Sequence, residues 1–128
     1  MNDTSVRHTE SIQAEGTDIQ LYVYTAFVTS VYDGDTITCT IDCGFNVKLH
    51  GRKIRLHGID TPELRGVERT DGLRVRDLLR EKILGKKIVL RTIRDRTGKY
   101  GRYIGVVYVD GENVNEWLLR EGHATEYS

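Results

Sequence analysis

The 128-residue sequence has only one proline and two cysteines, and its 19 basic and 19 acidic side chains leave no net charge. The two cysteines, Cys39 and Cys43, would lie ~13 Å apart in an extended strand, too far for a disulfide without a bend. They also lack the second pair of ligands that a structural zinc site requires. We therefore expect two free thiols, with Cys39 in the core and Cys43 in a turn.

Long hydrophobic runs are absent as well. No segment approaches the ~20 apolar residues of a membrane span. The first 20 residues contain no stretch of signal-peptide type. We therefore expect a cytoplasmic protein with no membrane partner, although a secreted protein whose signal peptide had been removed before residue 1 would show the same sequence.

The zero net charge hides an uneven distribution. Residues 1–20 carry one basic and four acidic side chains, whereas residues 48–102 carry 17 basic and seven acidic ones. Clustered charges are often only a solvated surface, but this excess also suits an anionic partner such as a nucleic-acid backbone. The length fits one domain. We expect a flexible arm over residues 1–20 and the folded domain over residues 21–128.

Hydrophobic patterns predict five strands and two helices. The strands, identified by β-branched and aromatic residues or by alternation, are residues 21–32, 36–42, 47–56, 88–94 and 103–109. One helix is expected between Asp71 as N-cap and Gly85, and a second between Asn113 as N-cap and Gly122. This order predicts an α+β, mainly β, fold: a five-stranded barrel with two helices, such as the oligonucleotide-binding (OB) barrel.

The stretch Arg55–Glu63, Arg-Leu-His-Gly-Ile-Asp-Thr-Pro-Glu, has the composition of an active site. Pro62, the only proline, restricts the residue before it to extended geometry. Side chains alternate along a strand, so Arg55 and Asp60 would point to opposite faces unless Gly58 introduces a bulge. We therefore expect Arg55, Asp60 and Glu63 to converge where this strand ends.

Another carboxylate, Asp35, lies in the expected turn Asp33-Gly34-Asp35-Thr36. Two carboxylates that lie close together repel each other, and a hard cation between Asp35 and Asp60 is a common resolution. The other interpretation is that both residues only cap turns, which Asp does often. The residues alone leave both interpretations open.

Three motifs, taken together and in this order, closely resemble the staphylococcal nuclease (thermonuclease) family. They are Tyr-Asp-Gly-Asp-Thr at Tyr32–Thr36, the stretch Arg55–Glu63, and Lys-Tyr-Gly-Arg at Lys99–Arg102. The resemblance covers roughly residues 27–127. It implies a calcium-dependent nuclease on an OB barrel that hydrolyses phosphodiester bonds of DNA, RNA or both and leaves 3′-phosphate ends. We expect a monomer.

The resemblance also implies a role for each site residue. The catalytic residues would be two arginines that clamp the phosphate and a carboxylate that accepts a proton from, or orients, the attacking water: Arg55, Arg102 and Glu63. The calcium ligands would be two carboxylates and a main-chain carbonyl: Asp35, Asp60 and Thr61. The substrate-binding residues would be Lys99, Tyr100 and Tyr127.

Two other functions use some of the same residues. A catalytically inactive OB-fold module could bind nucleic acid, but such a module typically lacks the carboxylates or the arginines that are present in this chain. A calcium-stabilised interaction module would use Asp35 and Asp60, but it would leave Arg55, Glu63 and Arg102 without a purpose.

Overall fold

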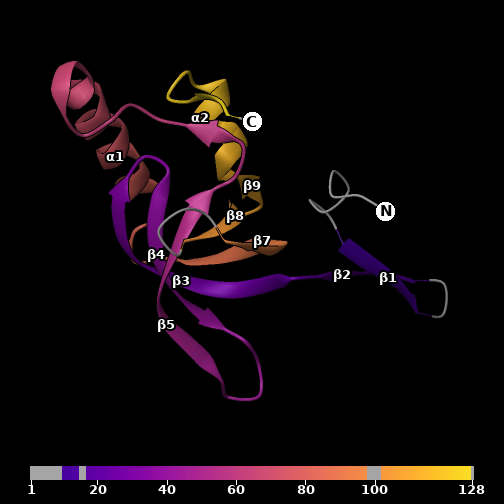
Figure 1. Ribbon diagram of the computed structural model, residues 1–128. Helices are drawn as coiled ribbons and strands as arrows, with labels where there is room; N and C mark the ends of the chain where they lie inside the picture. The colour runs from indigo at the N-terminus through magenta and orange to yellow at the C-terminus, as the bar shows by residue number, and fades with distance from the viewer. Residues whose placement is uncertain (1–9, 15–16, 98–101, 128) are drawn as a thin grey trace.

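The computed structural model describes residues 10–14, 17–97 and 102–127, and its centre is a closed β-barrel (Figure 1). The sheet order is β5-β4-β3-β7-β8-β9, and β5 also pairs with β8 in parallel, which closes the barrel. Its five long strands are β3 (Val23–Asp33), β4 (Thr36–Asp42), β5 (Lys48–Leu56), β7 (Lys87–Thr97) and β8 (Tyr103–Val109). The predicted five-stranded barrel is therefore confirmed.

Two helices cover the barrel, as predicted: α1 (Arg69–Ile83) and α2 (Val114–Arg120). The predicted N-cap of α1 is wrong. Glu68 occupies the cap position, and Asp71 lies inside the first turn, where its charge favours the helix N-terminus. The other predicted cap is confirmed, because the Asn113 side chain accepts a hydrogen bond from the backbone N–H of Glu116 at 3.0 Å. No helix in the described part of the chain is long and apolar enough to cross a membrane.

Short elements complete the chain. A 3-10 turn, η2 (Gly66–Glu68), precedes α1, and three two-residue strands are β6 (Ile59–Asp60), β9 (Glu112–Asn113) and β10 (Thr125–Glu126). A hairpin of β1 (Glu10–Ala14) and β2 (Thr17–Leu21) extends away from the barrel (Figure 1). The sequence pattern predicted no regular structure there, because these residues show no clear apolar alternation. Residues 1–9 of the predicted arm lie outside the described residues.

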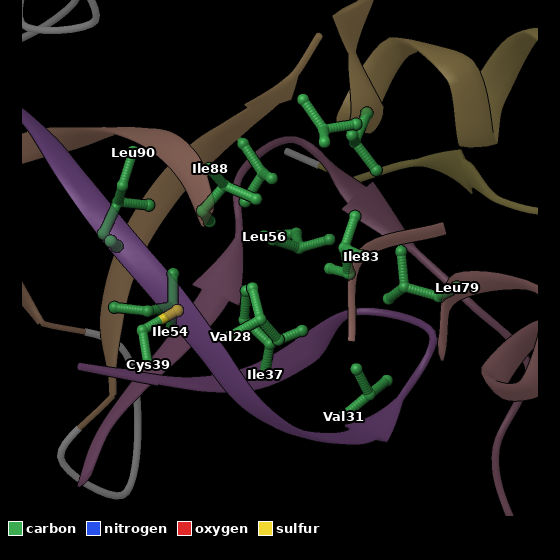
Figure 2. Packing of buried hydrophobic residues seen from close by; sticks show 14 of the residues in the cluster. Val28, Val31, Ile37, Cys39, Ile54, Leu56, Leu79, Ile83, Ile88 and Leu90 are labelled. Atoms are coloured by element: carbon green, nitrogen blue, oxygen red, sulfur yellow. The ribbon is translucent and has the colours of Figure 1, made fainter. Parts of the chain in front are cut away.

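The core fills the barrel and the space under α1 (Figure 2). Ile37 and Cys39 of β4 face Ile54 and Leu56 of β5, and Leu79 of α1 closes one end. All five side chains are buried, and each large one contributes ~1.5–3 kcal/mol relative to exposure. Burial raises the pKa of the Cys39 thiol to about 12. Both cysteines are free, so the prediction of a core Cys39 and an unpaired Cys43 is confirmed.

A buried asparagine fixes the end of β5 against β8. The Asn115 side chain accepts a hydrogen bond from the backbone N–H of Val107 at 3.1 Å. Its amide donates to the carbonyls of His57 and Gly105 at 2.9 and 3.2 Å. Because His57 follows the end of β5 whereas Gly105 and Val107 lie within β8, Asn115 holds the turn after β5 in place.

Helix α1 touches the backbone of the loop that follows Pro62. A Cβ atom on Gly72 would lie 2.1 Å from the carbonyl oxygen of Glu63, a distance that real Cβ atoms essentially never show. Only glycine therefore allows α1 to approach this closely, and the contact determines where Glu63 lies relative to the barrel.

We expect Gly72→Ala to lower the free energy of unfolding by ~1–3 kcal/mol, the usual cost of overpacking. Helix propensity alone predicts a gain of about 1 kcal/mol for the same change. Denaturant unfolding of the wild type and the variant measures the sign of this change in the free energy of unfolding. Thr70→Ala, at an exposed position in the same turn, is the matched control. A more stable Gly72→Ala variant would contradict the close contact between α1 and Glu63.

Candidate active site

The guanidinium of Arg55 joins three parts of the chain at the end of β5. Its Nη1 donates to the carbonyls of Leu56 and Ile59 at 2.9 and 2.8 Å. Its Nη2 donates to Oδ1 of Asp60 at 3.2 Å and lies 3.6 Å from Oδ2 of Asp35. The predicted convergence of Arg55 and Asp60 is therefore confirmed.

The turn after β5 explains how these groups meet. Gly58 has a φ of +80°, so the chain reverses there in a tight turn and not in the predicted bulge. L-residues with side chains rarely adopt this conformation, whereas glycine does so easily. Because β5 has already ended at Leu56, the turn brings β6 back beside the Arg55 guanidinium.

Asp35 is a buried carboxylate, only 6% exposed. Its Oδ2 accepts hydrogen bonds from the backbone N–H and the hydroxyl of Thr61, both at 3.0 Å. Its Oδ1 accepts one from the hydroxyl of Thr36 at 3.2 Å. Gly34 allows this approach, since a Cβ there would lie 2.7 Å from the Thr61 hydroxyl oxygen. The turn between β3 and β4 is thus packed directly against the residues before Pro62.

The other predicted catalytic residues lie around this pair. Nη1 of Arg102 lies 3.5 Å from the hydroxyl of Thr36, which in turn contacts Asp35. The side chain of Glu63 is exposed, and its backbone N–H donates to Oε1 of Glu68 at 2.9 Å. Arg102 therefore approaches the site beside Thr36, and Glu63 lines a groove together with Asp60 and Thr61.

The C-terminal residues of the described chain also contact the site. Strand β10 pairs with β6, with Thr125 opposite Asp60, and the backbone N–H of Tyr127 donates to the Gly58 carbonyl at 2.9 Å. The Arg55 guanidinium carbon lies 5.4 Å from the centre of the Tyr127 ring, a cation–π distance. The structure therefore brings Tyr127 to Arg55. The predicted residues Lys99 and Tyr100 lie outside the described residues.

Asp33 and Glu68 belong to the site, although the sequence analysis gave neither of them a role. Asp33 accepts a hydrogen bond from the backbone N–H of Asp35 at 3.0 Å. Burial, the negative charge of Asp35 and a side-chain hydrogen bond to it raise the pKa of Asp33 to about 7. The position of Asp33 two residues before Asp35 could have indicated its role. Nothing in the sequence connects Glu68 with the backbone of Glu63.

The donor atoms of the predicted metal set fit a hard cation. Among the described residues, no group of three or more His, Cys, Asp or Glu side chains is arranged to hold a metal ion. The predicted set, however, consists of two carboxylates and the Thr61 carbonyl. All of these donors are oxygens, which calcium binds, with water and substrate completing its six to eight ligands. Asp35 and Asp60 also both lie within 4 Å of one positively charged group, Nη2 of Arg55, at 3.6 and 3.2 Å.

Comparisons with known proteins identify the family of the chain. The model of the family described as "Staphylococcal nuclease homologue" matches residues 53–128. An "Uncharacterized endonuclease" of Escherichia coli O157:H7 is 37% identical over 102 residues, which cover 78% of this chain and 59% of that protein. The "SPbeta prophage-derived endonuclease YokF" of Bacillus subtilis is 35% identical over 96 residues, covering 72% of this chain and 30% of that protein.

A plant protein is similar to this chain over nearly the same length. The protein named "Probable staphylococcal-like nuclease CAN3" of Oryza sativa subsp. japonica is 33% identical over 94 residues, covering 71% of this chain and 22% of its own length. The chain thus spans less than two thirds of the length of these relatives. Because the family model matches more than half of this chain, and the barrel is the one that the motifs imply, the chain belongs to the staphylococcal nuclease homologue family.

Proposed function

We propose that this protein is a calcium-dependent nuclease that hydrolyses phosphodiester bonds of DNA, RNA or both and leaves 3′-phosphate ends. The observation that carries the proposal is the contact of one guanidinium, that of Arg55, with both Asp35 and Asp60. A purely structural strand end does not require a buried carboxylate and a second acidic group at the same cation. The family relationship supports the same conclusion.

The proposed role of Arg55 is to bind the phosphate that is attacked. Both hydrogen bonds of Nη1 go to main-chain carbonyls, which fixes the plane of the guanidinium. A phosphate would then compete with the carboxylates for Nη2. Negative charge grows on the phosphate oxygens in the transition state, so a pre-oriented donor is more effective there than in the ground state. Arg102 would act in the same way from the side of Thr36.

Glu63 is the proposed acceptor of the proton from the attacking water. Its side chain is exposed, so water can reach it, while Glu68 and Gly72 hold its backbone. The water oxygen would attack phosphorus, its proton would go to the Glu63 carboxylate, and the bond from phosphorus to the 5′-oxygen would break. A solvent water would protonate the departing 5′-oxygen, which leaves as a hydroxyl group. The phosphate then stays on the 3′-oxygen of the other product.

Asp35, Asp60 and the Thr61 carbonyl are the proposed calcium ligands. When bound, calcium would supply positive charge beside a phosphate oxygen and neutralise the carboxylates. Asp35 is already held in position by Thr36 and Thr61. Asp60 is more accessible, with a side chain 53% exposed, and can exchange its contact with Arg55 for one with a metal.

We expect Glu63→Gln to lower kcat by ~10²–10⁴-fold, the usual contribution of a general base. Glu63→Asp should also lose activity, because it keeps the charge but withdraws it by one methylene. Calcium affinity should change little in Glu63→Gln. Turnover and calcium binding are measured together, with Glu81→Gln, an exposed position on α1, as the control. Full activity of Glu63→Gln would end the general-base assignment.

Removal of one proposed calcium ligand should be visible without any turnover. A ligand that binds only the folded state raises Tm, so calcium should raise the Tm of the wild type. In Asp35→Asn this rise should disappear together with cleavage, whereas Asp42→Asn, an exposed residue at the other end of β4, should retain both. An undiminished calcium-induced rise in Tm for Asp35→Asn would remove Asp35 from the metal site.

A further inference from the structure

Two grooves lead away from the candidate active site, and they differ in charge. We call the first the carboxylate groove; its lining residues are Asp60, Thr61, Pro62, Glu63, Glu68 and the segment 122–125. We call the second the sheet groove; it has a volume of about 370 Å³ and is lined by Ser30, Tyr32, Asp33, Thr36, Thr38, Lys53 and Arg102. Three carboxylates line the first groove, whereas two cations, one carboxylate (Asp33) and four hydroxyl-bearing residues line the second.

We propose that the sheet groove binds a single-stranded segment of the nucleic acid substrate, next to the phosphodiester held at Arg55. This inference rests on the proposed nuclease function and adds a binding track to it. The basic side chains that line the two grooves indicate which groove binds the substrate strand. The lining of the carboxylate groove supplies no lysine or arginine, whereas Lys53 and Arg102 of the sheet groove attract an anionic chain.

Strand register makes the sheet groove continuous with the active site. Thr36 pairs with Arg55, and Thr38 pairs with Lys53. Lys53 and Arg55 are therefore two residues apart on one face of β5, roughly 7 Å along the strand. A chain whose phosphate contacts Arg55 can thus reach the Lys53 ammonium with a neighbouring phosphate.

The opposite wall of the groove comes from the end of β3. Ser30 pairs with Thr38, so their hydroxyls lie on the same face as Lys53. The pairing then changes from Val31–Ile37 to Asp33–Thr36, which leaves Tyr32 as the extra residue of a bulge. Bulges next to active sites often redirect a side chain.

Tyr32 is suited to stack on a base. It is 64% exposed although it lies in β3, a long strand of the barrel wall, next to the buried Val31. An exposed aromatic ring beside a cationic groove is the combination that single-strand binding sites use, because every base has a face that can stack. Lys53 would bind the backbone and Tyr32 one base, which makes the track tolerant of sequence.

The experiment compares short and long substrates. For the wild type and variants, kcat/KM is measured on a dinucleotide and on single-stranded octanucleotides of DNA and of RNA, with calcium. In Tyr32→Ala, kcat/KM on the octanucleotide relative to kcat/KM on the dinucleotide should fall about tenfold, the size of loss expected when one base loses its stacking partner. Tyr32→Phe should restore the ratio, because it keeps the ring.

A second measurement needs no turnover. Affinity for a labelled octanucleotide is measured with chelator present, over a range of salt concentrations. If Lys53 contacts a phosphate, Lys53→Ala should reduce the slope of log affinity against log salt by about 0.7, the value for one contact on a single strand. Lys53→Arg should keep the wild-type slope. The DNA and RNA arms show whether the track discriminates between the two.

Phe27→Ala and Lys87→Ala are the matched controls. Phe27 is another exposed aromatic of β3, and Lys87 is an exposed lysine of β7 that lines a separate groove. Both controls should retain the wild-type ratio and salt slope. The proposal is overturned if Tyr32→Ala and Lys53→Ala behave like these controls, or if all four variants lose affinity equally.

Failure of the nuclease proposal gives a different result. If the wild type cleaves neither substrate with calcium, the nuclease function is wrong, and the binding measurement with chelator still tests the groove. Loss of octanucleotide affinity in Tyr32→Ala and Lys53→Ala would then assign the track to a binding protein. Normal cleavage with no effect of either variant would reject the groove and leave the nuclease function in place.

Discussion

The site depends on one side chain, the guanidinium of Arg55, and on the oxygens that surround it. It binds two main-chain carbonyls of the turn after β5, the exposed carboxylate of Asp60 and the buried carboxylate of Asp35. The two carbonyls fix the plane of the guanidinium. In the proposed function, the two carboxylates bind calcium beside it, so that one phosphate can contact both the arginine and the metal. The contact is thus structural and, in the proposed function, catalytic.

The barrel supplies the rigidity that this contact requires. Because β5 pairs with β4 on one side and with β8 on the other, neither edge of its last residues is left open. Asn115 fixes the turn that follows, and Gly72 brings α1 against the backbone of Glu63. Contacts from β4, β8, α1 and α2 therefore hold the end of β5 and the residues after it before any ligand arrives. Electrostatic stabilisation of a transition state requires such an arrangement.

The sequence predicts the structure best where one pattern determines one element. Alternation of Ile37, Cys39 and Ile41 defined β4, and the stretch from Arg55 to Glu63 identified residues that converge in space. Prediction failed where the outcome depends on contacts between distant segments. The β1–β2 hairpin has no apolar alternation, and no motif connects the backbone N–H of Glu63 with the Glu68 carboxylate that accepts its hydrogen bond. Burial, which depends on packing, is the largest cause of the elevated pKa of Asp33.

The central claim is that the shape of the Arg55 guanidinium, and not only its charge, is required for cleavage. The most direct measurement is the kcat and KM of Arg55→Lys on DNA with calcium, below the Tm of the variant, with Arg120→Lys as a surface control. Lysine keeps the charge but cannot bind two carbonyls and a phosphate in one plane. We expect a fall in kcat of about 100-fold with little change in KM. Retention of full kcat by Arg55→Lys would contradict it.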